Sequence, residues 1–284
     1  IGGWYKISGN TFQGTCRALH PWVVLDGTQF SGVGTHLKYY IEEGGAYNDV
    51  TPLRLTTSAG DVTFAASNGS AVITASDTDH GAIKGDFVTF TGAATLGGNI
   101  TASVLNQEYE ITEIVNANSY KFTATATANS SDTGNGGGST VGKYQINIGL
   151  DTSVGGSGWG AGTWGRGTWG SSSSLIAAGA TLRLWSHDNF GEDLLMNVRD
   201  GGIYYWDRSD SSSSFVRAVA LSDESSDAKT PTIAKQILVS DVDRHVIAFG
   251  CDSETAIGTQ DPLLIRFSDQ ESLTTWTTTS TNTA

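Results

Sequence analysis

The sequence is poor in the residues on which several classes of protein depend. Its 284 residues include 2 cysteines, 4 prolines and 1 methionine, and only 16% are charged, against about 25% in a typical globular domain. Cys16 and Cys251 lie far apart, so we expect two buried free thiols, and a long-range disulfide is the alternative that spacing cannot decide. No signal peptide and no run of 18 apolar residues is present, so no membrane span is indicated.

Basic residues are scarce as well. The chain has 16 Lys and Arg against 29 Asp and Glu, a formal net charge of −13. No cluster of Lys and Arg could neutralise phosphates, which argues against nucleic-acid binding by a basic face. An acidic surface favours solubility and repels DNA that passes nearby.

Catalytic motifs are missing too. No histidine stands in a metal-ligand spacing, and neither a G-x-S-x-G elbow nor a phosphate-binding loop occurs. His187, Asp188, Glu192 and Asp193 gather within one short polar segment. We interpret it as a polar turn between Trp185 and a following strand. A calcium site is the alternative, although the spacing does not match the EF-hand loop. We therefore predict no catalytic residues, no metal, no cofactor and no enzyme.

Glycine and aromatic residues are plentiful. The chain has 36 Gly, 8 Trp, 9 Tyr and 10 Phe, and so many aromatic residues are not typical of a disordered chain. No stretch shows apolar residues at helical spacing over a helical length. Short β-branched or aromatic runs bounded by Gly, Asp, Asn and Ser recur instead. The pattern predicts an all-β protein.

Composition divides the chain into four parts. Residues 1–54 hold short strands and the turn pair Asp26-Gly27, which suits a tight hairpin. Residues 55–148 contain no Trp and no Cys and alternate in short strands, which we interpret as a small β-barrel or sandwich inserted into the first domain. Residues 149–180 are a Gly/Trp-rich connection. Residues 181–284 return to strands and continue the first domain.

The Gly/Trp-rich connection spaces three tryptophans five residues apart, at Trp159, Trp164 and Trp169. Glycine this dense does not form a stable strand or helix by itself. Three exposed indoles would form a sticky patch, so one interpretation has them inserted in the core of a neighbouring domain. The other interpretation is an assembly contact or a platform on which a sugar stacks.

A weak internal repeat joins three segments, each with an apolar strand, a turn and a second strand ending near an aromatic residue. They are residues 22–41, 194–207 and 245–269. Such hairpins are typical of β-propeller blades, and a mixed β-sandwich is the alternative. Three partial blades do not close a ring. The first residue, Ile1, and the Thr-rich end also indicate a fragment of a longer chain.

Several segments resemble tail structural proteins of tailed bacteriophages. They are residues 15–22, 34–40, 49–54, 184–194 and 202–207. The closing part, residues 245–250 through 265–269 to Trp276, resembles the tail nozzle (tail tubular protein B) of short-tailed bacteriophages. The resemblance implies a subunit based on a β-propeller, in a homo-oligomer that forms a hexameric ring below the tail adaptor. It further implies contact with tail fibre proteins, passage of DNA without specific binding, and a location in the virion. Residues 80–81, 85–90 and 106–111 resemble a small β-domain common in virion proteins.

Two functions follow from these observations. The first is a structural subunit of a phage tail, which forms a tube for genome ejection. The alternative is a carbohydrate-binding receptor-recognition module or a depolymerase-type tail protein, favoured by the spacing of Trp159, Trp164 and Trp169, because aromatic faces stack on sugars.

Overall fold

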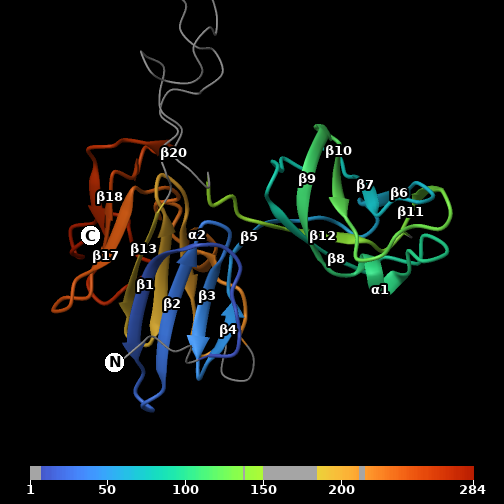
Figure 1. Cartoon of the computed structure of the whole chain (residues 1–284). Helices are drawn as coiled ribbons and strands as arrows, with labels where there is room; N and C mark the ends of the chain where they lie inside the picture. Colours follow the sequence, from blue (N-terminus) through green and yellow to red (C-terminus); the bar gives the residue numbers. More distant parts are fainter. Residues whose placement is uncertain (1–7, 137, 150–183, 211–214) are drawn as a thin grey trace, which may run out of the picture. The chain divides into compact units, whose positions relative to one another are not determined.

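A computed structural model describes residues 8–136, 138–149, 184–210 and 215–284 (Figure 1). The described residues form strands with two short helices, so the all-β prediction is confirmed. The chain divides into two compact units: the first comprises Ile1–Val50 and Ile148–Ala284, and the second comprises Thr51–Asn147. None of the helices in the described part is long and apolar enough to cross a membrane.

The first unit is built from antiparallel sheets whose strands follow one another in sequence. The first sheet has the order β1-β2-β3-β4, the second β13-β14-β15-β16 and the third β17-β18-β21. Their strands are β1 Cys16–Val23, β2 Gln29–Thr35, β3 Tyr39–Glu43, β4 Ala46–Asp49, β13 Trp185–Phe190, β14 Asp193–Val198, β15 Ile203–Trp206, β16 Val219–Ala220, β17 Gln236–Val239, β18 Val246–Phe249 and β21 Ile265–Phe267. A ribbon of β19 (Asp252–Ser253) and β20 (Ala256–Gln260) precedes β21, and helix α2 (Leu221–Glu224) follows β16.

Tight turns produce this succession of neighbouring strands. Gly27 has a φ of +87° in the turn between β1 and β2, and Gly191 has a φ of +69° in the turn between β13 and β14. Such backbone angles favour glycine because it has no Cβ. The Asp26-Gly27 turn thus lies where the sequence placed it.

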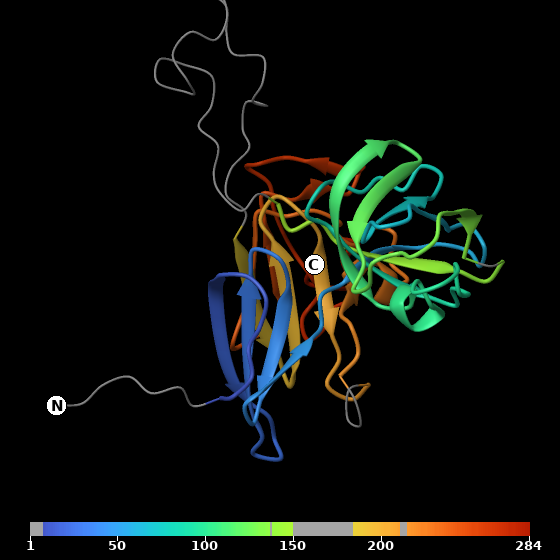
Figure 2. The same cartoon turned by 45° about the vertical axis from the view of Figure 1, so that its right-hand side comes forward.

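The second sheet lies between the first and the third and buries both of its faces. Figure 2 shows the blue strands of the first sheet beside the yellow strands of the second. An aromatic cluster of Trp22, Phe30, Trp206 and Phe215 fills the space between these two sheets. On the other side, Leu195 and Ile203 of the second sheet share a core with residues of the third: Ile237, Val239, Val246 and Ala248, with Trp276.

The weak repeat corresponds to equivalent places in the sheets. Residues 194–207 form β14 and β15, and residues 245–269 include β18 and β21, which are the second and third strands of their sheets. The sequence segments that resemble each other therefore occupy matching positions. Among the described residues, however, the sheets close into neither a propeller nor a barrel.

The second unit is an eight-stranded antiparallel sheet in the order β11-β6-β7-β10-β9-β8-β12-β5. Its strands are β5 Leu53–Thr56, β6 Thr63–Ala66, β7 Val72–Ser76, β8 Phe87–Thr91, β9 Glu108–Asn116, β10 Ser119–Thr123, β11 Asp132–Asn135 and β12 Val141–Gln145. The unit encloses a core rich in Phe and Tyr. It also contains helix α1 (Ala102–Leu105), whose N-terminus is capped by the side chain of Thr101. β5 and β12, which are the first and last strands of this unit in the sequence, pair so that Leu53 lies opposite Gln145.

Two expectations need correction. The segment predicted as a polar turn, residues 186–193, is mostly strand β13, and only Gly191 and Glu192 form the turn. Its polar side chains find partners on neighbouring sheets, which a search for apolar alternation overlooks. Both cysteines are free thiols, but only Cys251 is buried, while Cys16 is partly exposed.

Candidate functional site

Strand β13 is the centre of the stack of three sheets. Successive side chains of a strand point to opposite faces, and here each face bonds to a different neighbour. On one face, Ser186 Oγ accepts a hydrogen bond from Ile237 N (3.1 Å), and Asp188 Oδ2 accepts one from Val239 N (2.8 Å). These two N–H groups of β17 point away from its partner β18. The side chains of β13 therefore cap an edge of β17 that would otherwise lack partners.

The opposite face of β13 contacts the first sheet. Trp185 Nε1 donates to Thr35 O (2.8 Å), and the Tyr39 hydroxyl lies 2.7 Å from His187 Nδ1. Another polar pair joins His20 Nε2 to Asn189 Oδ1. These residues come from segments far apart in the sequence. Their contacts therefore fix the position of the first sheet against the second.

The environment of His187 keeps its imidazole neutral. Burial, with a smaller contribution from the nearby His20, lowers the pKa of this side chain to about 4. The two histidine rings lie 4.9 Å apart between centroids. A neutral, half-buried imidazole that bonds to a tyrosine hydroxyl of the neighbouring sheet is a packing group.

Glycine on β2 permits this close approach. A Cβ on Gly34 would lie 2.5 Å from Trp185 Cδ1, and one on Gly32 would lie 2.3 Å from the Tyr39 hydroxyl. Neither distance is possible for real atoms, so the indole and the phenol occupy space that only glycine leaves free. The second sheet thus approaches the first at Gly34, whereas Gly32 makes room for Tyr39 of the neighbouring strand β3.

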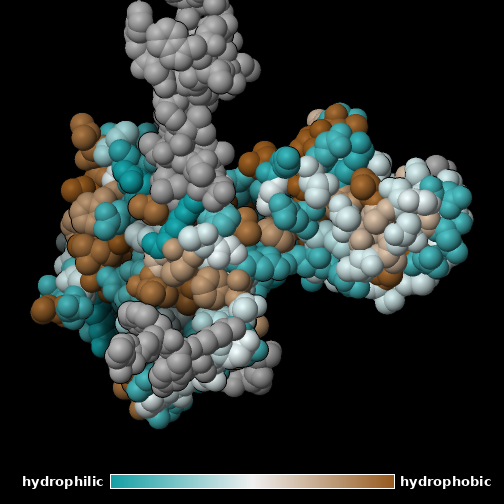
Figure 3. Space-filling model, viewed as in Figure 1, coloured by the Kyte–Doolittle hydropathy of each residue, from teal (hydrophilic) through white to brown (hydrophobic). Residues whose placement is uncertain are grey.

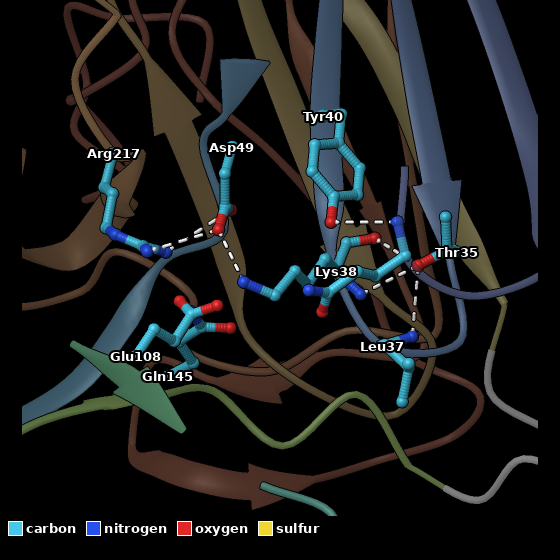
Figure 4. A network of polar contacts seen from close by, with 9 residues as sticks. Thr35, Leu37, Lys38, Tyr40, Asp49, Glu108, Gln145 and Arg217 are labelled. Carbon is cyan, nitrogen blue, oxygen red and sulfur yellow. Dashed lines mark hydrogen bonds and ion pairs between the residues drawn. The ribbon is translucent and has the colours of Figure 1, made fainter. Parts of the chain in front are cut away.

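A buried ion pair ties the first sheet to the segment before β16. Lys38, at 2% exposure, places Nζ 2.7 Å from Asp49 Oδ2, and Arg217 Nη2 lies 3.2 Å from the same oxygen (Figure 4). The backbone continues this contact, because Ala218 N donates to Val50 O at 3.0 Å. A buried cation is costly without a partner charge, so Asp49 stabilises Lys38 in place.

The two outer sheets each leave one face open in the described part of the chain. On the third sheet, cross-strand pairing aligns Leu238, Ile247 and Phe267 in one row and Phe249 with Ile265 in the next. Ile265 and Phe267 are 56% and 44% exposed. Figure 3 shows hydrophobic residues gathered over the region of β17 and β18.

The outer face of the first sheet is open only in part. It exposes Leu19, Pro21 and Val23 of β1, whereas Phe12 packs on Tyr40 of β3 and Tyr47 of β4. A shallow pocket of about 250 Å³ lies here, lined by Pro21, Trp22, Val23, Gln29, Phe30, Ser31 and Glu42. Since the second sheet lies between the other two, these two open faces are at opposite ends of the stack. Their residues differ, so the two faces are not copies of one surface.

The second unit holds a polar pocket of its own. It measures about 460 Å³ and is lined by Asp61, Thr63, Ser76, Asp77, Thr78, Asn116, Asn118 and Ser119. Asp77 is buried and accepts a hydrogen bond from the Tyr144 hydroxyl (2.5 Å), which in turn lies 2.8 Å from the Tyr120 hydroxyl. Burial raises the pKa of the Asp77 carboxyl. The lining offers hydroxyl, amide and carboxylate groups to a polar ligand.

The acidic residues near His187 have separate structural partners. Asp193 accepts from the Tyr205 hydroxyl (2.7 Å) and Arg208 N (3.0 Å), and burial raises the pKa of its carboxyl. Glu192 accepts from Leu25 N (2.5 Å). In the described ranges, no three His, Cys, Asp or Glu side chains gather as they would around a metal ion.

The predicted contact residues Trp159, Trp164 and Trp169 lie outside the described residues. Sequence reasoning missed the partnership of His20, His187 and Tyr39, and it missed the open edge and face of the third sheet. No local signal could have predicted the contacts of His20, His187 and Tyr39, because these residues are far apart in the chain. Alternating apolar residues within residues 236–249 could have suggested the exposed face of the third sheet.

Comparison with known proteins adds little information about the fold or the function. No protein-family model matches the chain, and no curated protein matches it. Among solved structures, the chain is similar to the phage phi92 endosialidase, with a TM-score of 0.24 and 13% identity. The alignment covers 89% of this chain and 35% of that one, so the chain spans about a third of that protein's length. A likeness of this degree does not define a common fold.

Proposed function

We propose that the chain is a structural subunit of a bacteriophage tail, part of a nozzle-like tube for genome ejection, and that it is not an enzyme. The segments that resemble phage tail proteins support this proposal. Those that resemble tail structural proteins fall on β1, β3, β13 and β15, and the closing segments that resemble the nozzle fall on β18 and β21. In this proposal the three sheets are consecutive blades of a propeller, and the second unit is a small β-domain inserted between the first two.

The stacking of the sheets is the observation that carries the proposal. The second sheet is covered on both faces, whereas the third sheet exposes Ile265 and Phe267 and the first sheet exposes the outer side chains of β1. Two different open faces at opposite ends of a stack favour a head-to-tail contact between copies. Such a contact, repeated, closes into a ring when the rotation allows it. The net charge of −13 fits a channel that DNA leaves without sticking.

The ring is tested with the whole chain in solution. Light scattering after gel filtration should give a closed oligomer, and negative-stain images should show a central channel. Leu19→Glu on one face and Phe267→Glu on the other should each shift the protein toward monomer. Val115→Glu changes an exposed apolar residue in the second unit and should leave the ring intact.

A chain that stays monomeric at high concentration, and that is absent from purified virions, would contradict the structural role. If the ring forms but the Leu19→Glu and Phe267→Glu variants assemble as the parent does, the contact between copies does not use these two faces. The proposal of a tube would still stand in that case.

The alternative function is carbohydrate recognition at the cell surface. The polar pocket of the second unit favours it, since its hydroxyl, amide and carboxylate groups are those that sugar hydroxyls bond. A glycan array with the whole chain tests this function, with Asn118→Ala as the pocket variant and Asn68→Ala, outside the pocket, as the control. An array without hits would exclude it for the glycans presented.

A further inference from the structure

The polar pocket of the second unit lies where four neighbouring strands begin or end. Strand pairing places Thr63 of β6 opposite Ser76 of β7, and Ser76 opposite Ser119 of β10. Ser119 in turn lies opposite Asn116 of β9. These residues therefore form one row across four strands that are neighbours in the sheet (Figure 1). Since neighbouring strands lie about 4.8 Å apart, the three hydroxyl groups of the row span about 10 Å.

The hydroxyl groups around this row are open to a ligand. Those of Thr63, Ser76, Thr78 and Ser119 line the pocket and make no hydrogen bond within the described residues. A hydroxyl group both donates and accepts, as the hydroxyl groups of a sugar do. The pocket volume of about 460 Å³ lies within the range of about 300–1,000 Å³ that is usual for small-ligand sites. A row of this length in a pocket of this size suits a short oligosaccharide.

Two carboxylates give the pocket a negative charge. Ser58 N donates to Asp61 Oδ2 (2.8 Å), and the Tyr144 hydroxyl donates to Asp77 Oδ2 (2.5 Å). The Oδ1 atom of each carboxylate accepts no hydrogen bond within the described residues. No Lys, Arg or His is among the residues that line the pocket. A positively charged group of a ligand would therefore find two acceptors there and no competing cation.

Burial leaves the Asp77 carboxylate short of compensating charge. Asp77 is 5% exposed, and burial raises the pKa of its carboxyl, with a smaller contribution from Asp61. Arg54 and His80 oppose part of this rise, but both lie outside the pocket lining. An ammonium group beside Asp77 Oδ1 would offset the cost of burying the carboxylate.

We propose that this pocket binds an oligosaccharide that contains an unacetylated amino sugar. Its ammonium group contacts Asp61 and Asp77, and its hydroxyl groups bond to the row of Thr63, Ser76 and Ser119. The same two carboxylates repel acidic sugars, so charge selects the ligand. This inference rests on the carbohydrate alternative above and deepens it by naming the class of sugar. It does not depend on the tube.

The test compares three probes in slightly acidic buffer, in which amines are protonated. They are a β-1,4-linked trisaccharide of glucosamine, the same trisaccharide with every amino group acetylated, and spermidine, an amine without hydroxyl groups. Titration calorimetry with the whole chain should show binding of the glucosamine trisaccharide and about tenfold weaker binding of the other two probes. The amide NMR signals of Thr63, Ser76 and Ser119 should shift on binding.

Variants separate the pocket from the overall negative charge of the chain. Asp61→Asn should weaken binding of the glucosamine trisaccharide about fivefold and leave binding of the acetylated one unchanged. Asp77→Asn keeps an acceptor for the Tyr144 hydroxyl and should weaken binding by at least as much. The matched control, Asp241→Asn, removes an exposed carboxylate of the first unit and should leave binding unchanged.

Equal binding of the two trisaccharides would overturn the selection for an amino group and leave carbohydrate recognition standing. Spermidine that binds as tightly as the glucosamine trisaccharide, or millimolar Ca²⁺ that displaces it, would overturn the proposal because the occupant would be a simple cation. So would a lack of binding at millimolar trisaccharide, and the glycan array then decides separately whether the carbohydrate alternative stands.

Discussion

Gly34 shows at the scale of one residue how a missing side chain positions two sheets. The indole of Trp185 occupies the space where a Cβ would stand, and Trp185 Nε1 then reaches Thr35 O. The hydrogen bond and the ring packing depend on the same gap. The tryptophan and the glycine must therefore be considered as one unit of packing, although they lie on strands far apart in sequence.

Gly34→Ala should lower the free energy of unfolding by about 1–3 kcal/mol, because overpacking displaces the indole. Urea denaturation followed by tryptophan fluorescence measures the change. Gly9→Ala is the control, since a Cβ there would meet no atom within 4 Å, and it should change stability by less than about 0.5 kcal/mol. Equal effects of the two substitutions would show that the close approach at Gly34 has no energetic role.

His187 makes stability depend on pH. The pKa of this side chain is about 4 in the folded protein, against 6.5 for an ordinary histidine. The unfolded chain therefore binds a proton first as pH falls. The stabilisation is complete above about pH 6.5 and is lost progressively down to about pH 4, with a total of about 3 kcal/mol. The comparison is between the parent and His187→Gln, with unfolding measured from pH 7 to 4. The parent should lose more stability than the variant, and parallel pH profiles would argue against the assignment.

At the scale of elements, β13 binds two neighbours because its side chains alternate. Polar side chains are usually a sign of exposure, yet Ser186 and Asp188 face the backbone of β17 and cap its N–H groups. One strand thereby gives the third sheet a satisfied edge and gives the first sheet a partner for Tyr39. Hydrogen bonds from the backbone of β17 to side chains of β13 thus join the two sheets, where backbone-to-backbone hydrogen bonds would otherwise be needed.

Asp188→Ala should therefore destabilise the protein by about 1–3 kcal/mol, because the Val239 N–H loses a charged acceptor. Hydrogen exchange should accelerate at Val239 more than at Ile237, which keeps its bond to Ser186. Asp188→Asn retains an acceptor oxygen and should cost less than the alanine variant. If both variants exchange alike at Val239, the cap is not what protects this edge.

At the scale of the whole molecule, the chain leaves the first unit at Val50, forms the second and returns at Ile148. The pairing of β5 with β12 brings the two ends of the second unit side by side. Insertion into a loop of the first unit needs this arrangement, since entry and exit must be close together. The core of the second unit consists of its own residues.

The excised segment of residues 51–147 should fold alone with a cooperative thermal transition, observed by circular dichroism and by dispersed amide signals. Residues 57–147, which lack β5, are the matched comparison and should melt at a lower temperature, because β12 loses one partner. A disordered 51–147 segment would show that the second unit needs the first one to fold.

Local signals in the sequence were enough to predict the class of the fold and many of its strands. The short strands predicted within residues 55–148 are present, β8 at Phe87–Thr91 among them, because alternating apolar residues and flanking turns are local signals. The change in composition near residue 55 and the Asp26-Gly27 turn are local as well. The hypotheses on Trp159, Trp164 and Trp169 stay predictions.

Only the tertiary structure decided how the sheets stack. It made β13 a strand rather than a turn and paired His20 and His187 with residues of the other sheet. The physical reason is that such contacts join segments up to 169 residues apart. A polar side chain carries no local sign of whether water or a neighbouring sheet will satisfy it.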